Sequence, residues 1–111
     1  MNTETMNTEM NISEAFDAVE QGHCVARKEM NGKRMFIFQR PNFELEVAKL
    51  SQVQSIPGEA KVAIAAIMGE NAKVVFPPYL CMFTPDGTII NGWVPSKADA
   101  LAKDWMIVRY Q

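Results

Sequence analysis

With 111 residues, the chain has room for one domain around one hydrophobic core, and contents of 48% hydrophobic and 22% charged residues are ordinary for a globular fold. The formal net charge of −2 argues against a general DNA- or RNA-binding protein, which carries a strong basic excess. Two cysteines are too few for a disulfide framework. No signal-peptide pattern opens the chain, and its longest apolar run, residues 62–68, is too short to cross a bilayer. We therefore expect a cytoplasmic protein that binds neither nucleic-acid polymers nor membranes.

The first ten residues, MNTETMNTEM, nearly repeat a polar tetrapeptide and contain almost nothing to bury, so we expect a disordered N-terminal extension over residues 1–10. A helix is predicted to follow, because Asn11 and Glu14 match a capping box. The apolar residues spaced along one face of this helix are Ile12, Ala15, Phe16 and Val19. Gly22 occupies the usual position just beyond a helix C-terminus.

The middle of the chain predicts strands and one helix. Residues 24–28 are expected to form a short strand, and Asn31-Gly32 is a strong turn signal. Residues 33–39 are apolar on both faces, as in a strand that lies between two layers or meets a partner subunit. Residues 43–47 alternate as a half-exposed strand does, whereas the Ala- and Ile-rich residues 59–68 favour a helix.

The last third of the chain predicts a hairpin and a final strand. Its expected strands are residues 74–76, 79–83, 88–90 and 105–109. Pro85-Asp86-Gly87 supplies the hairpin turn, and Ser96 is placed to cap a short helix over residues 97–103. Strands gathered around a few helices without a βαβ rhythm predict an α+β fold. We expect a small antiparallel sheet with an N-terminal helix and a short C-terminal helix, in a single domain over residues 11–111.

Groups suited to catalysis are scarce. His23 is the only histidine and is adjacent to Cys24, and neighbours in a strand point to opposite faces, so they do not form a nucleophile–base pair. One histidine and two distant cysteines do not supply the three or four converging ligands of a zinc site. The glycines are isolated and form no Walker or Rossmann phosphate loop. We expect no enzymatic activity, no metal and no cofactor.

One candidate site is a cluster of cations opposed only by Glu29. Its members are Arg27, Lys28, Lys33, Arg34 and Arg40. An Asn-Gly turn flanked by these cations can offer backbone N–H groups and positive charge to an anionic ligand. The alternative, slightly favoured by the residues alone, is a set of solvated strand-edge charges that discourage aggregation.

A second candidate site is the block of residues 91–99 together with Asp104-Trp105. Trp93 next to a turn can stack on a base, and a helix N-terminus at Ser96 can bind a polar group. Alternatively, both tryptophans are core residues and Ser96 is only a helix cap. The block indicates a ligand site without identifying the ligand.

These segments also carry a family resemblance. In the first half of the domain the matching residues are Ile12-Ser13-Glu14-Ala15-Phe16, Gly22 and Val25-Ala26-Arg27-Lys28-Glu29-Met30-Asn31-Gly32-Lys33-Arg34-Met35-Phe36-Ile37. In the second half they are Pro78-Tyr79-Leu80-Cys81-Met82, Asp86-Gly87-Thr88-Ile89, Trp93, Ser96, Asp99-Ala100-Leu101-Ala102, Asp104-Trp105 and Val108. On these residues the chain resembles the second Thoeris anti-defence family of small phage proteins. Residues 42–72 match poorly and are expected to be a family-variable insertion.

The resemblance implies a non-enzymatic protein that sequesters cyclic ADP-ribose isomers made by TIR-domain immune enzymes in the host bacterial cell. It also implies a homotetramer with ligand pockets between subunits, which agrees with the doubly apolar strand. The pyrophosphate of such a ligand is a natural partner for the cation cluster. Where the family has Trp before Asn-Gly-Lys, this chain has Met30, a softer contact for adenine, and Glu29 replaces a glycine.

The expected ligand-binding residues are Arg27, Lys28, Met30, Asn31, Phe36, Tyr79, Trp93, Ser96 and Asp99. Arg27 and Lys28 are expected near phosphate. Trp93 is expected to stack, with Phe36 or Tyr79 compensating for the missing tryptophan. Asn31, Ser96 and Asp99 are expected to hydrogen-bond. Two alternatives stay open, a protein that sequesters cyclic di- or trinucleotides and an interaction module that inhibits a host factor through its apolar strand, while a hydrolase is disfavoured for want of a catalytic set.

Overall fold

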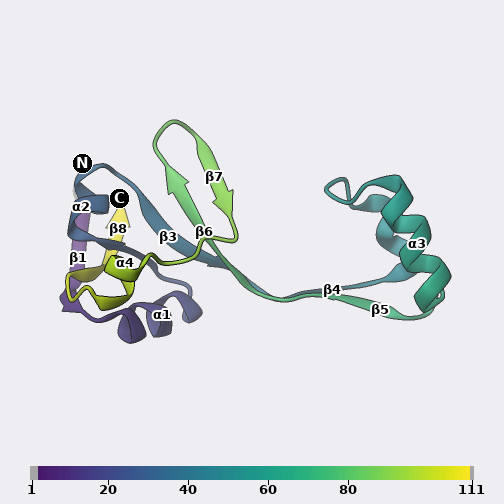
Figure 1. Ribbon diagram of the computed structural model, residues 1–111, viewed down its shortest axis with the longest axis horizontal. Coiled ribbons are helices and arrows are strands. Elements are labelled where there is room, and N and C mark those ends of the chain that lie inside the picture. The colour runs from purple at the N-terminus through teal and green to yellow at the C-terminus, as the bar shows by residue number, and fades with distance from the viewer. Residues whose placement is uncertain (1–2, 111) are drawn as a thin grey trace. The chain divides into compact units, whose positions relative to one another are not determined.

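The computed structural model describes residues 3–110 and divides the chain into two compact units. Residues 1–40 and 79–111 make up the sheet unit, and residues 41–78 make up the inserted unit. Residues 42–72, the segment that matches the family poorly, lie within this second unit (Figure 1). Helices combine with antiparallel sheets throughout, which confirms the predicted α+β class. Within residues 3–110, no helix has the length and apolar character needed to span a bilayer.

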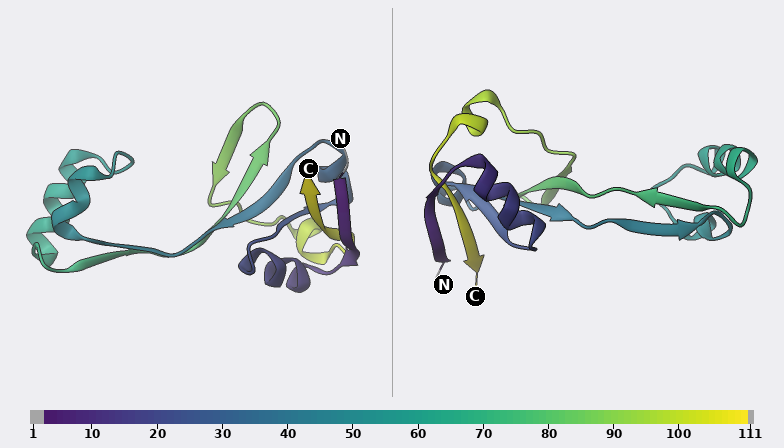
Figure 2. Two further views of the ribbon diagram at one scale, coloured as in Figure 1. Left: turned by 180° about the vertical axis from the view of Figure 1, so that it is seen from behind. Right: turned by 90° about the horizontal axis from the view of Figure 1, so that it is seen from below.

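The sheet unit is built on one six-stranded sheet in the order β1-β8-β2-β3-β6-β7, with every neighbouring pair antiparallel. Its strands are β1 Thr3–Met10, β2 Cys24–Arg27, β3 Phe36–Arg40, β6 Tyr79–Thr84, β7 Thr88–Asn91 and β8 Trp105–Tyr110. Its helices are α1 Ile12–Glu20, α2 Lys28–Gly32 and α4 Lys97–Leu101. Strands β1 and β8 run side by side in both views of Figure 2. The expected N-terminal and short C-terminal helices are therefore present as α1 and α4.

Helix α1 follows its local signals closely. The Asn11 side chain accepts from the Glu14 N–H at 2.8 Å, and the Glu14 carboxylate accepts from the Asn11 N–H at 3.0 Å, which completes the predicted capping box. At the other end Gly22, with φ of +95°, lets His23 donate its N–H to the Ala18 carbonyl at 3.1 Å. The apolar face of α1 packs on the sheet and forms one core with Val25 and Trp105.

Two segments differ from the sequence-based expectation. Residues 3–10 form β1, where a disordered extension was expected, because pairing with β8 satisfies a backbone whose side-chain pattern carries no strand signal. Asn31 and Gly32 lie in α2 and do not form the expected turn. The reversal falls instead at Arg34, whose φ is +60°, and there Met35 donates its N–H to the Met30 carbonyl at 2.9 Å. Helix α2 is favoured over the Asn-Gly turn because it buries part of Met30 against the core.

The inserted unit contains β4 Phe43–Glu46, a 3-10 helix η1 Val47–Gln52, α3 Gly58–Met68 and β5 Lys73–Phe76. Strands β4 and β5 pair antiparallel, with Phe43 opposite Phe76. The helix and both strands expected here are confirmed. Val47 and Leu50 are its buried apolar residues, and α3 has no buried residue. Helix α3 is therefore a mostly apolar helix that leaves Val62, Ile67 and Met68 exposed.

Candidate ligand-binding site

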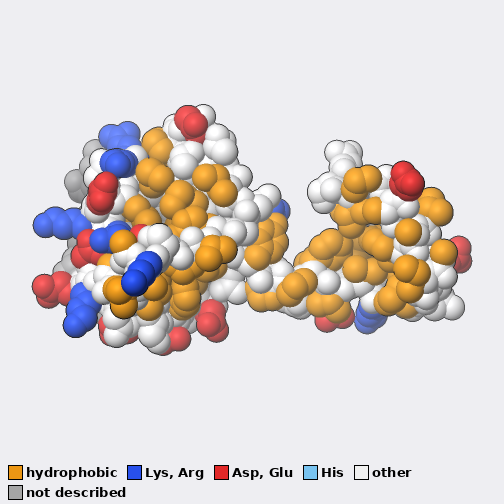
Figure 3. Space-filling view, viewed as in Figure 1, with side chains coloured by type: hydrophobic (Ala, Val, Ile, Leu, Met, Phe, Trp, Pro, Cys, Tyr) orange, Lys and Arg blue, Asp and Glu red, His pale blue; other side chains and the backbone are white. Residues whose placement is uncertain are grey.

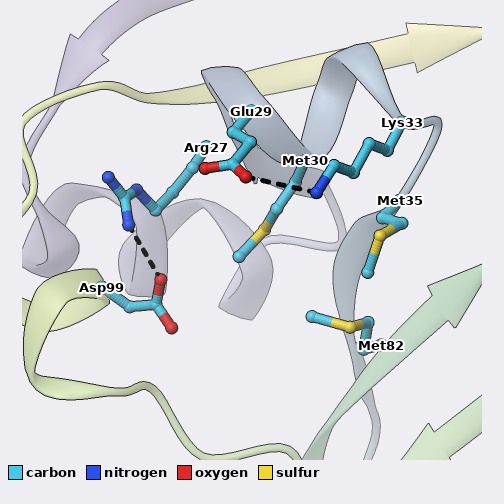
Figure 4. A pocket seen from close by; sticks show the side chains of 7 residues that line it. All are labelled: Arg27, Glu29, Met30, Lys33, Met35, Met82 and Asp99. Atoms are coloured by element: carbon cyan, nitrogen blue, oxygen red, sulfur yellow. Dashed lines mark hydrogen bonds and ion pairs between the residues drawn. The ribbon is translucent and has the colours of Figure 1, made fainter.

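A cavity of about 190 Å³ opens in the sheet unit beside α2 (Figure 4). The residues that line it are Arg27, Glu29, Met30, Lys33, Met35, Met82 and Asp99. They come from β2, α2, the segment before β3, strand β6 and α4, so the cavity gathers residues from both halves of the chain. Cations, carboxylates and apolar side chains all contribute to its walls.

Arg27 stands at the end of β2 and binds two carboxylates. Its Nη1 donates to Asp99 Oδ1 at 3.1 Å, and its Nε donates to Asp104 Oδ1 at 3.0 Å. The side chains of Arg27 and Asp99 are only 24% and 15% exposed, so this pair is partly shielded from water. Charge-assisted hydrogen bonds in such a setting are stronger than those of a fully exposed pair. Both bonds fix α4 and the start of β8 against β2.

Asp99 also makes the hydrogen bonds that hold α4 in place. Its Oδ2 accepts from the Ser96 N–H at 3.0 Å, and its own N–H donates to Ser96 Oγ at 3.1 Å, which completes a second capping box. Trp105 donates its indole N–H to the main-chain oxygen of Asp99 at 3.0 Å. Helix α4 has five residues and none is buried, so these polar contacts, more than packing, hold it in place.

The same contacts set the ionisation of Asp99. Burial alone raises the pKa of this carboxyl, but the backbone N–H of Ser96 and the Arg27 guanidinium outweigh burial and hold the pKa below its usual range. The hydrogen bonds that Arg27 donates to Asp104 and Asp99 in turn raise the pKa of Arg27. Both side chains of the pair are therefore charged at neutral pH.

The second ion pair of the cavity is far more exposed. Lys33 Nζ lies 3.2 Å from Glu29 Oε1, four residues earlier, and the two side chains are 64% and 74% exposed. Pairs of this kind are weak because water and salt screen them. The two cations of the cavity thus differ greatly in how firmly they are held.

The apolar part of the cavity is made of thioethers. Met82 is almost fully buried in β6, while Met30 and Met35 are half-buried and pack against the same core. Methionine side chains are flexible and polarisable, so such a surface adapts to the face of a flat ligand. Met30 stands at the position where the family resemblance leads one to expect a tryptophan.

Three of the nine residues expected from sequence line this cavity: Arg27, Met30 and Asp99. Lys28 and Asn31 lie on α2, the former exposed and the latter half-buried, and Ser96 lies beside the cavity as the cap of α4. Glu29, Lys33, Met35 and Met82 also line the cavity but are not among those nine residues, although Lys33 belongs to the predicted cation cluster and Glu29 opposes that cluster. The spacing of Glu29 and Lys33 by four residues was an available signal for a helical pair.

Trp93 packs inside the sheet unit near this region. Its ring meets Trp105 edge-on, with centroids 6.1 Å apart and an interplanar angle of 74°. The backbone N–H of Trp93 donates to the Leu80 carbonyl at 2.9 Å. Trp105 is buried and Trp93 is half-buried, so Trp93 has a packing role and keeps part of its ring accessible.

Phe36 and Tyr79 are not brought to the cavity. Ile37 pairs with Met82, so its neighbour Phe36 points to the opposite face of the sheet, where it stacks on Phe83 at 5.1 Å. Tyr79 begins β6 opposite Arg40, whose guanidinium carbon lies 5.6 Å from the ring centre. The structure therefore separates the expected aromatic residues from the cation–carboxylate cluster.

The fold and the cavity define a small α+β domain whose candidate site combines fixed charges, an exposed ion pair and a thioether wall. The sequence model of the Thoeris anti-defense 2-like domain matches residues 10–108, and the chain belongs to this family. It is also 32% identical over 103 residues to Thoeris anti-defense 2 of Bacillus phage SP01, a match that covers 93% of this chain and 99% of that relative. Family membership confirms the resemblance seen in the sequence and assigns the chain a role in phage anti-defence.

Proposed function

We propose that the chain is a non-catalytic protein that binds and sequesters cyclic ADP-ribose isomers made by TIR-domain immune enzymes, in the cytoplasm of the infected cell. The observation that carries this proposal is the cavity itself, which places cations, a hydrogen-bonding carboxylate and an adaptable apolar wall within one small space. A cyclic ADP-ribose isomer presents a pyrophosphate, ribose hydroxyls and a flat base. Asp99 accepts from ribose hydroxyls in this account, and Met30 lies against the base.

The chemistry of the lining residues supports binding without turnover. Asp99 has a lowered pKa and is held by Ser96 and Arg27, so at neutral pH it is a poor proton donor. Burial raises the pKa of the Cys24 thiol, which favours the unreactive protonated form, and Cys24 does not line the cavity. We therefore expect bound ligand to be returned unaltered.

The size of the cavity supports a site shared between subunits. At about 190 Å³ it is smaller than the roughly 300–1,000 Å³ that ligand pockets usually occupy. A second copy of the chain that closes over the cavity supplies the missing walls. A homotetramer with pockets between subunits, as the family resemblance implies, meets this need.

The inserted unit offers a surface for such self-association. It spans residues 41–78, near the lower size limit of about 40 residues for a domain that folds alone. Val62 and Ile67 of α3 are 71% and 82% exposed, and residues 62–69 contain no charge. Figure 3 shows hydrophobic side chains over much of this unit. The charges of α3, Glu59 and Lys61, lie near its N-terminus. An exposed apolar helix surface of this kind is normally covered, and we propose that a second copy covers it.

Titration calorimetry tests the proposal directly. The purified protein is titrated with TIR-derived cyclic ADP-ribose isomers and, in parallel, with cyclic di- and trinucleotides. We expect saturable binding of a cyclic ADP-ribose isomer at a fixed number of sites per oligomer. Binding of the cyclic oligonucleotides alone contradicts the proposed ligand, and binding of neither class leaves a protein-interaction inhibitor as the better account of the anti-defence role.

A further inference from the structure

The two cations that line the cavity are not equally available to a ligand. Arg27 donates hydrogen bonds from Nη1 to Asp99 and from Nε to Asp104. All three side chains belong to the network that holds α4 on β2. Turning Arg27 toward a ligand leaves two carboxylates without their partner, one of them partly buried. Arg27 therefore stabilises the structure of the site and is less available to bind a ligand.

Lys33 is held by a single exposed contact with Glu29. It has a compact charge on a flexible stem, with three donors that reorient freely. Glu29 is held no more firmly, because no other ion pair or side-chain hydrogen bond of Glu29 is found within residues 3–110. Figure 4 shows the Glu29 carboxylate joined to the Lys33 ammonium, while a second contact joins Arg27 to Asp99. An anion that enters the cavity can therefore replace Glu29 at Lys33 more easily than it can replace the carboxylates bound to Arg27.

We propose that Lys33 contacts the anionic group of the ligand and that Glu29 competes with that group for Lys33. In the structure the Glu29 carboxylate lies 3.2 Å from Lys33 Nζ. The ligand phosphate takes its place beside Lys33, and Glu29 rotates into solvent. Glu29 thus lowers the affinity of the empty site for anions and makes it depend on salt. This inference rests on the proposed function for the identity of the ligand, but not for the existence of the anion contact.

Inorganic pyrophosphate tests the contact without any nucleotide. The side-chain signals of the lysines are followed by NMR in the wild-type protein and in Glu29→Gln during a pyrophosphate titration. We expect the Lys33 signal to shift more than that of Lys103, an exposed lysine of the same unit outside the cavity. The pyrophosphate concentration at the midpoint of the titration falls roughly two- to fivefold in Glu29→Gln, because one competing charge is removed. An unchanged midpoint, or a Lys33 shift no larger than that of Lys103, overturns the inference.

Calorimetry with the cyclic ADP-ribose isomer gives the second readout. We expect Lys33→Gln to weaken binding about tenfold and to flatten its salt dependence, since one charge-assisted contact is lost. Matched controls are Lys103→Gln and Glu20→Gln, which make the same charge changes at exposed positions outside the cavity. Thermal midpoints close to wild type show that the variants fold. Wild-type protein that binds pyrophosphate through Lys33 but no cyclic nucleotide contradicts the proposed function, whereas tight nucleotide binding unaffected by Lys33→Gln contradicts this inference.

Discussion

Arg27 and Asp99 are 72 positions apart in the sequence, yet Nη1 of the first lies 3.1 Å from Oδ1 of the second. The pair joins the end of β2 to α4, and Asp104 extends it to the segment before β8. The Asp99 carboxylate also caps its own helix, and the main-chain oxygen of Asp99 accepts from the Trp105 indole, so this one residue organises a wall of the cavity. The site is therefore built on an ion-pair network that joins β2 to α4 and to the segment before β8.

Replacement of Arg27 by glutamine tests this network. Arg27→Gln leaves the Asp99 carboxylate partly buried without its cation, and we expect a loss of about 1–2 kcal/mol in the free energy of unfolding. The thermal midpoint falls by several degrees in a domain of this size. Lys103→Gln removes a positive charge at an exposed position and serves as the control. Equal midpoints for wild type and Arg27→Gln show that the network does not stabilise the fold.

The lowered pKa of Asp99 makes the contribution of this network depend on pH. A carboxyl whose pKa is lower in the folded than in the unfolded state stabilises the fold above its usual pKa. The contribution is lost progressively as pH falls from about 5 toward the folded pKa. The stability difference between wild type and Arg27→Gln therefore shrinks over this range.

Urea unfolding of both proteins between neutral pH and about pH 3 measures that difference. Asp86 also has a lowered pKa, through hydrogen bonds from Thr84 and Thr88, but this hairpin turn does not involve Arg27. Its contribution is the same in both proteins and cancels. A difference that stays constant with pH contradicts the assignment of the effect to Asp99.

Local signals account for the elements that the sequence predicts well. The two capping boxes, at Asn11 and Ser96, mark α1 and α4 because each is complete within four residues. The Pro85-Asp86-Gly87 turn likewise marks the β6–β7 hairpin, where Gly87 has a φ of +94°. These features depend on neighbours in the sequence and need no knowledge of the tertiary fold.

The rest depends on contacts that no local pattern encodes. Strand β1 exists through its pairing with β8, about a hundred residues away, and α2 replaces the expected turn because Met30 packs on the core. In the site, the Arg27–Asp99 pair is a long-range contact, and the placement of Phe36 follows from the register that aligns Ile37 with Met82. A cluster of cations in the sequence did not reveal which of them is already neutralised.

An aromatic side chain in place of one methionine of the cavity wall is expected to raise the affinity for the ligand. Met30→Trp restores the residue type that the family resemblance implies at this position, and we expect tighter binding of the cyclic ADP-ribose isomer by about 0.5–1.5 kcal/mol through stacking on the base. Met30→Leu, which keeps the volume and removes the sulfur, is the control. Calorimetry on variants of unchanged helical content measures the effect. A folded Met30→Trp protein with wild-type affinity places the base elsewhere.

If the exposed residues of α3 join the copies of the proposed oligomer, a charge placed on this helix breaks the assembly. Ile67→Glu puts a charge on the most exposed apolar residue of this helix, and we expect the protein to elute as a smaller species in size-exclusion chromatography with light scattering. Gln52→Glu makes the same charge change at an exposed position of the inserted unit and is expected to leave the assembly intact. An unchanged mass for Ile67→Glu excludes α3 as the association surface.

Recovery of the bound ligand tests the central claim, sequestration without turnover, most directly. The protein is incubated with a stoichiometric amount of a cyclic ADP-ribose isomer, separated from free ligand by filtration, and then denatured by heating. Chromatography of the filtrate and of the heated fraction measures how much ligand was held and in what form. The account predicts that nearly all of it stays with the folded protein and is released intact. A new product peak that grows with incubation time reveals an enzyme, and ligand that passes freely through the filter contradicts sequestration.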